Sequence, residues 1–410
     1  SVGSTDHVEL QAQRSVQRPG LADLTAVPFA ALAIEINGTV VGLASPDAWR
    51  PIEGEPGAFE AFVEDAEGKG VLRLERRYEL IPGTFRLEMA RRTENLTGQP
   101  ISVRWYETGP IDLPEPTMGY GGDKRRVRFG YLLNDKMQAG SDTVTADHEL
   151  KGRPTVLGKP PKNTSGYKAY KAEEAIWPTP ASDKKGHRLV WAAFTGRYFA
   201  VALHPLFDPA AVQPGGEEKL FTEVQRLDRL VLNPYSAGNS DEDAVMVMRV
   251  TTARETVAPG AVSEVATGLY AGPLLKRELA VDDLSRSLNL GGLVVYNFGG
   301  MCGEMCTFGW LTHVLFFVLS AAHALTLDWA ASIIILVLIV RTALHPITRW
   351  SQIRLQRFSK QMQGLAPKQA KLREKYKDDQ KKMQSEMARL WKEEGINPAG
   401  ALGCLPMFLQ

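Results

Sequence analysis

The segment that most constrains this chain runs from Asp328 to Arg349, because it is apolar over most of its length and yet contains Arg341. As an α-helix, its twenty intervening residues rise roughly 30 Å, enough to cross the hydrocarbon core of a bilayer. A charged side chain near the centre of such a helix costs about 2.5–3.5 kcal/mol and usually faces a bundle interior or a water-filled cavity. We therefore expect Arg341 to be a functional residue. The alternative is that its side chain snorkels into the headgroups.

The residues that follow this segment are strongly basic, although the 410-residue chain has a net charge of only +1. Between Arg349 and Glu394 there are thirteen Lys and Arg against six Asp and Glu, so the rest of the chain is acidic. The positive-inside rule then predicts that residues 349–395 are cytoplasmic and that the N-terminal part lies across the membrane.

Apolar residues recur at spacings of three and four from Leu355 to Tyr376 and again from Met383 to Leu390, which predicts an antiparallel helical hairpin over 349–395. Pro367 should kink its first helix or begin a new helical section. The hairpin is either a solvated connector or a contact surface for RNA, anionic lipid or a partner protein. The basic residues of that candidate surface are Arg349, Arg354, Arg357, Lys360, Lys368, Lys371 and Arg373.

Residues 1–285 read as β-rich. Asn37-Gly38 between apolar runs indicates a hairpin, and alternation from Leu72 to Trp105 indicates strands of about seven to nine residues separated by turns at Pro82-Gly83 and 95–98. Further strands are expected at 189–203, 220–232 and 243–251. We expect 151–186 to be a long loop with one short helix near 170–176. Together these features predict an antiparallel sandwich.

No catalytic motif accompanies the scattered histidines of this domain, His7, His148, His187 and His204, so we do not expect an enzyme. Residues 1–301 contain no cysteine and hence no disulfide framework. Cys302 and Cys306 could form a local disulfide or a pair of metal ligands, although no His or Asp ligands are spaced alongside them. Cys404 is interpreted as a small apolar packing residue. We expect no metal and no cofactor.

The C-terminal part divides further. We predict a linker at 286–304, an uncharged helix at 305–327 that is either interfacial or spanning, a transmembrane helix at 328–348, and the start of a further transmembrane helix at 396–410. The first residues contain no signal peptide, so an export signal or anchor is expected to precede them.

Several motifs carry a resemblance to a known family. Four stretches of the chain closely resemble the YidC/Oxa/Alb membrane protein insertases. They are Val340-Arg341 to His345-Pro346-Ile347-Thr348, Leu365-Ala366-Pro367-Lys368, Gly395-Ile396-Asn397-Pro398 and Gly403-Cys404-Leu405-Pro406. The match covers 310–410. More loosely, 78–103 and 268–273 resemble the large periplasmic domain of bacterial members.

The resemblance implies a multi-domain, multi-pass protein of the bacterial inner membrane: an all-β supersandwich periplasmic domain, similar to sugar mutarotases, followed by an α-helical membrane insertase core. It implies an amphipathic periplasmic helix at 305–327 and five core spans. Arg341 would lie in a hydrophilic groove that receives clients without covalent chemistry.

The resemblance also implies partners, which are nascent membrane proteins, the lipid bilayer, the Sec translocon, and the ribosome and targeting factors at the cytoplasmic hairpin. The alternatives are a sensor with a β-sandwich ectodomain or a membrane-anchored carbohydrate-binding protein.

Overall fold

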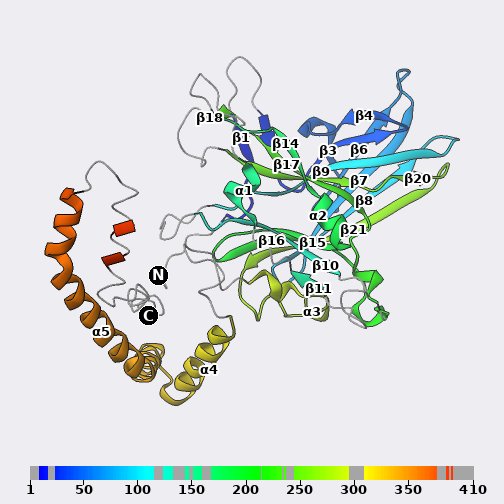
Figure 1. Cartoon of the computed structure of the whole chain (residues 1–410). Coiled ribbons are helices and arrows are strands. Elements are labelled where there is room, and N and C mark those ends of the chain that lie inside the picture. The colour runs from blue at the N-terminus through cyan, green and yellow to red at the C-terminus, as the bar shows by residue number, and fades with distance from the viewer. Residues whose placement is uncertain are drawn as a thin grey trace. The chain divides into compact units, whose positions relative to one another are not determined.

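The computed structural model describes residues 9–16, 24–114, 123–132, 144–146, 151–158, 168–213, 215–232, 235–236, 244–294, 309–375, 385–386 and 389–390. The chain divides into two compact units, Ser1–Val295 and Tyr296–Gln410. Figure 1 shows the first as a body of strands and the second as helices. Each unit is described by itself.

Two large antiparallel sheets form the described part of the first unit. One has ten strands in the order β11-β10-β15-β16-β21-β8-β7-β6-β5, with β12 paired to β10. Their bounds are β5 Arg50–Pro51, β6 Ala58–Glu64, β7 Gly70–Leu80, β8 Arg86–Asn95, β10 Arg126–Leu132, β11 Val144–Ala146, β12 Lys151–Gly152, β15 Arg188–Thr195, β16 Phe199–Pro205 and β21 Val262–Pro273.

The other large sheet has seven strands in the order β14-β17-β19-β9-β3-β4, with β20 paired to β9. Their bounds are β3 Ala31–Ile36, β4 Thr39–Gly42, β9 Ile101–Ile111, β14 Glu173–Trp177, β17 Val224–Val231, β19 Met246–Thr252 and β20 Glu255–Val257. Two small ribbons pair β1 Arg14–Val16 with β2 Leu24–Ala26, and β13 Lys168–Ala169 with β18 Tyr235–Ser236.

The hydrophobic core lies between the two large sheets. In one cluster, Phe129 and Leu203 of the ten-stranded sheet pack with Met248 of the seven-stranded sheet. In a second, Leu72 of β7 packs with Trp105 of β9. All five side chains are at most 3% exposed. The first unit is therefore a sandwich of two antiparallel sheets, as the alternation of apolar residues predicts.

Short helices cover parts of this sandwich. On the outer face of the ten-stranded sheet, Leu284 of α3 (Asp283–Ser287) and Leu293 of η5 (Leu290–Leu293) pack against Trp191 and Tyr270. The remaining short helices are η1 Pro46–Ala48, α1 Arg153–Leu157, α2 Pro180–Lys185, η2 Pro209–Ala211 and η3 Glu217–Lys219.

Local sequence signals located the turns well. Asn37 (φ 49°) and Gly38 (φ 91°) both adopt positive φ between β3 and β4, which confirms the hairpin. The turn after Asn95 is also confirmed: Asn95 Nδ2 donates to the Gln99 carbonyl at 2.7 Å, and the Thr97 N–H donates to Asn95 Oδ1 at 2.9 Å. However, this turn carries the chain from β8 in one sheet to β9 in the other.

Three expectations for the strands were wrong in detail. The segment 189–203 is two paired strands rather than one. Strands β7, β8 and β9 have 11, 10 and 11 residues, longer than predicted. The helix expected near 170–176 is instead the strand β14, because pairing with β17 supplies the hydrogen bonds of its backbone.

The second unit contains two long helices, α4 Gly309–Thr326 and α5 Trp329–Lys375. The helix α5 is continuous across Pro346 and Pro367, so no new helical section begins at Pro367. A proline removes one backbone donor, and the remaining i→i−4 bonds on either side keep the helix together.

Candidate functional site

A tight corner joins α4 to α5. Leu327 adopts the left-handed conformation (φ 55°), and its N–H donates to the His323 carbonyl at 2.8 Å. The next residue, Asp328, caps α5: its Oδ1 accepts from the Ala331 N–H at 2.8 Å. The chain therefore turns within two residues, and the Asp328 side chain satisfies one of the backbone donors in the first turn of α5.

Small and aromatic residues hold this corner together. Ser332 is fully buried, Ala322 is 6% exposed, and the hydroxyl oxygens of Thr326 and Ser332 lie 2.8 Å apart. The His323 ring stacks on Trp329, with 3.8 Å between the ring centroids. Small side chains allow two helices to approach closely, so these contacts fix α4 against the first turn of α5.

Among the described helices, α5 contains the one window that is long and apolar enough to cross a membrane, Trp329–Pro346. Only 6% of this window is buried. Large apolar side chains such as Ile334 (61% exposed) and Leu338 (60% exposed) are therefore not covered by the residues that the structure describes. The shorter apolar stretch Val314–Thr326 lies in α4.

Arg341 lies within this window with its side chain exposed. At about 1.5 Å of rise per residue it is roughly 18 Å along the helix from Trp329. With about 100° between successive residues, Arg341, His345, Thr348 and Gln352 lie on one side of α5, and Ser332 lies on the opposite side. The Thr348 hydroxyl donates to the Leu344 carbonyl at 3.0 Å.

These four residues, which we call the polar stripe, begin at the arginine and continue toward the C-terminal part of α5. On the N-terminal side of Arg341 the same face is apolar, with Ile334 and Val337. Sequence reasoning identified Arg341 but missed His345, Thr348 and Gln352. The signal that would have found them is their spacing of four, seven and eleven residues from Arg341.

The predicted basic contact residues all fall in the C-terminal part of α5. Arg349 is exposed. For the other six, Arg354, Arg357, Lys360, Lys368, Lys371 and Arg373, the structure places the backbone in α5. The second arm of the predicted hairpin, the three cysteines and the predicted further span at 396–410 lie outside the described residues, apart from two helical dipeptides at 385–386 and 389–390.

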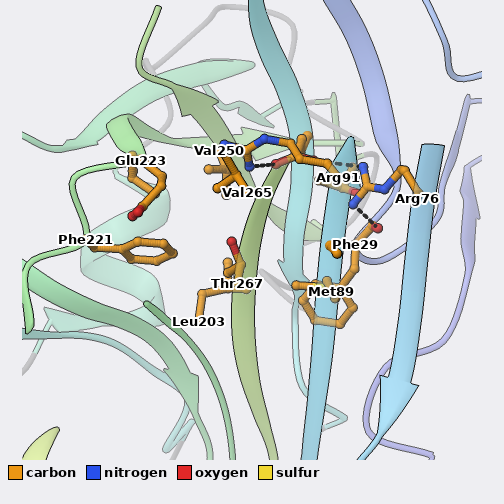
Figure 2. A pocket seen from close by; sticks show the side chains of 14 residues that line it. Phe29, Arg76, Met89, Arg91, Leu203, Phe221, Glu223, Val250, Val265 and Thr267 are labelled. Atoms are coloured by element: carbon orange, nitrogen blue, oxygen red, sulfur yellow. Dashed lines mark hydrogen bonds and ion pairs between the residues drawn. The ribbon is translucent and has the colours of Figure 1, made fainter. Parts of the chain in front are cut away.

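A small cavity lies between the sheets of the first unit, with charged residues among its lining (Figure 2). Glu107 of β9 pairs with Arg76 of β7 at 2.9 Å and with Arg91 of β8 at 3.3 Å. Arg76 also donates to the Phe29 carbonyl at 3.1 Å. In Figure 2 these arginines lie on one side of the cavity and Glu223 on the other.

This cavity has a volume of about 30 Å³. That is room for a water molecule or two and far less than the roughly 300–1,000 Å³ typical of ligand pockets. The cavity therefore has no space for a substrate. The charged triad of Glu107, Arg76 and Arg91 instead joins the two sheets across the core.

Parts of this chain are similar to known proteins. The family model described as 60Kd inner membrane protein matches residues 321–410. A membrane protein insertase YidC of Pseudomonas fluorescens is 32% identical over 220 residues, which are 54% of this chain and 31% of that protein. The YidC of Shewanella woodyi is 35% identical over 154 residues, 38% of this chain and 25% of that protein.

These matches support the resemblance to the YidC/Oxa/Alb insertases that the motifs predict. The matched part spans about a third or less of these two YidC proteins, 31% and 25% of their lengths.

Two solved structures resemble part of this chain only weakly. A galactose mutarotase related enzyme from Lactobacillus acidophilus is 10% identical with a TM-score of 0.30, covering 60% of this chain and 80% of that one. A GH36 alpha-galactosidase from Geobacillus stearothermophilus is 12% identical with a TM-score of 0.28, covering 64% and 32%. Scores this low support no inference about fold or activity, and the sandwich is defined by its own strand pairing.

Proposed function

We propose that this chain is part of a membrane protein insertase and that α5 is its client-contact helix. The observation that carries the proposal is Arg341, a charged residue in the one described helix long and apolar enough to span a bilayer, in a chain that resembles the YidC/Oxa/Alb insertases. The relatives named above are insertases, so a carbohydrate-binding or sensor protein is not favoured.

In this proposal the polar stripe of α5 lines a hydrophilic groove within the membrane. Arg341 attracts acidic side chains in the translocating tail of a client, since a guanidinium forms paired hydrogen bonds with a carboxylate. Meanwhile the client's apolar helix lies along lipid and along uncovered side chains such as Ile334 and Leu338. An unpaired polar group costs several kcal/mol to bury in hydrocarbon, so a wet groove lowers the barrier to translocation without ATP or covalent chemistry.

The proposal includes an orientation and a location. The basic C-terminal part of α5 lies in the cytoplasm, where it receives clients from ribosomes and targeting factors, and the sandwich unit is periplasmic. The positive-inside rule supports this orientation. The protein is then a multi-pass protein of the bacterial inner membrane that acts alone or with the Sec translocon, and its groove is completed by the further spans that the family resemblance implies.

The test is insertion of a single-span client with an acidic tail by the reconstituted protein, including those further spans. Arg341→Ala should slow insertion about tenfold or more, equivalent to about 1.4 kcal/mol of barrier. Arg341→Lys should retain most of the rate because it keeps the charge. Val337→Ala is the matched control, since it lies on the same face of α5 and carries no charge, and it should insert the client at the wild-type rate. Equal rates for wild type and Arg341→Ala would reject the proposal.

A further inference from the structure

A second, larger pocket opens on the outer face of the seven-stranded sheet. It has a volume of about 490 Å³, and its lining includes Arg104 and Tyr106 of β9, Arg226 and Asp228 of β17, and Arg249 and Thr251 of β19. This volume falls within the range of small-molecule sites. The pocket lies within the first unit and is separate from the cavity around Glu107.

Positive charge exceeds negative charge in the lining of this pocket, because three arginines line it and Asp228 is the one acidic residue among its lining. Asp228 is fully buried and accepts from Arg226 Nε at 2.7 Å and from Arg249 Nη2 at 2.8 Å. Arg249 also pairs with Glu173 at the edge of the sheet, and Arg226 lies 3.9 Å from the same carboxylate. The carboxylate of Asp228 therefore holds two guanidinium groups in fixed positions and shares the compensation of their charge with Glu173.

Arg104 is the least compensated cation of the three. Its nearest described acidic partner is Glu35, with 3.8 Å between Nη1 and Oε2. Glu35 already accepts from the Tyr106 hydroxyl at 2.9 Å and pairs with Arg254. The side chain of Arg104 is 21% exposed, and its Nε is buried without a hydrogen-bond partner. A largely buried cation with so weak a partner favours an anion beside it.

We propose that this pocket binds a phosphate-type oxyanion, with Arg104 and Arg226 as its main ligands. A carboxylate is satisfied by a single guanidinium fork, whereas the terminal oxygens of a phosphate can accept hydrogen bonds from several groups at once. Guanidinium groups from three neighbouring strands line this pocket together with the hydroxyl of Thr251. The phosphate belongs either to a soluble compound or to a lipid headgroup.

The test uses the intact protein in nanodiscs of phosphatidylcholine, titrated calorimetrically with inorganic phosphate at constant ionic strength and pH 7. We expect saturable binding of phosphate and at least tenfold weaker binding of acetate. Arg104→Gln and Arg226→Gln should each weaken phosphate binding about tenfold or more, the loss expected for a charge-assisted hydrogen bond. Arg277→Gln, which removes an 82% exposed arginine elsewhere in the same unit, is the matched control and should bind phosphate like the wild type.

The proposal is wrong if phosphate does not saturate the protein, or if both pocket variants bind it as the wild type does. Should Arg104→Gln fail to fold, Arg226→Gln carries the test, because the Arg226 side chain is 48% exposed and is easier to replace. Once phosphate binding is established, nanodiscs that contain phosphatidylglycerol identify the source. Competition with phosphate indicates a lipid headgroup, and unchanged affinity indicates a soluble phosphate compound.

Discussion

Glu107 joins the two large sheets through ion pairs in the core. It lies in β9 of the seven-stranded sheet and pairs with Arg76 and Arg91, which are directly opposite one another on β7 and β8 of the ten-stranded sheet. All three residues are at most 8% exposed. Removing one member of such a group leaves uncompensated charge in the core.

We predict that Glu107→Gln lowers the unfolding free energy of the sandwich by about 3–5 kcal/mol, the usual cost of breaking a buried ion pair. Denaturant titration followed by the circular dichroism of the strands measures this change. Glu264→Gln, on an exposed position of β21, is the control and should change stability by less than about 0.5 kcal/mol. Equal stability of the two variants would show that the triad contributes nothing.

His204 gives the sandwich a dependence on pH. The side chain is fully buried beside Gly268, where a Cβ atom would lie 2.1 Å from the imidazole Cε1, and its Nδ1 is 2.9 Å from the Pro205 carbonyl oxygen. Burial, with a smaller contribution from the charge of Arg86, lowers the pKa of His204 from 6.5 to about 4, although the Pro205 carbonyl and Asp282 oppose the shift. The unfolded chain therefore binds this proton more readily than the folded one.

It follows that the stability due to His204 is complete above pH 6.5 and is lost as the pH falls from 6.5 to about 4. The loss is on the order of 3 kcal/mol, since each pKa unit corresponds to about 1.4 kcal/mol. The pKa of neighbouring Asp282 is lowered from 3.8 by its hydrogen bonds with Ser285 and by Arg86, so this carboxyl titrates below the window. Thermal unfolding of wild type and His204→Gln across pH 4–7 checks the prediction. The variant should lose most of the slope, and an unchanged slope would contradict it.

Among helices and strands, those with strong local signals were the easiest to predict. The Asn37-Gly38 hairpin required only two residues that tolerate positive φ. The strand β14 was misread as a helix, because its identity depends on pairing with β17, more than fifty residues away in the sequence. The passage from β8 to β9 between the sheets is likewise set by packing rather than by the turn.

The start of α5 depends on its cap. We predict that Asp328→Ala destabilises the first turn of α5 by about 1 kcal/mol, because the Ala331 N–H loses its acceptor. Hydrogen exchange of the amides at 330–332 should then accelerate about fivefold. Asp328→Asn keeps a capping oxygen and should exchange at the wild-type rate. Equal protection in Asp328→Ala would mean that contacts with α4 alone hold this turn.

For the molecule as a whole, the sequence predicted the sandwich and the apolar helix, because each leaves a periodic or compositional signal. The role of Arg341 stays a prediction. The oxyanion pocket was not predictable, since Arg104, Arg226 and Arg249 come from three strands that only the sheet brings together. The polar stripe was missed for a different reason. Its residues are single polar positions in an apolar helix. That they share one side of the helix is recognised only when their spacing is counted from Arg341.

The central claim is that the charge of Arg341 acts on the acidic tail of a client. The most direct test measures insertion of two clients that differ only in the tail, with Asp and Glu in one and Asn and Gln in the other, by wild type and by Arg341→Ala. We predict a large loss of rate for the acidic tail and little or no loss for the amide tail, a coupling that isolates this pair of charges. An equal loss for both tails, or none for either, would contradict the claim.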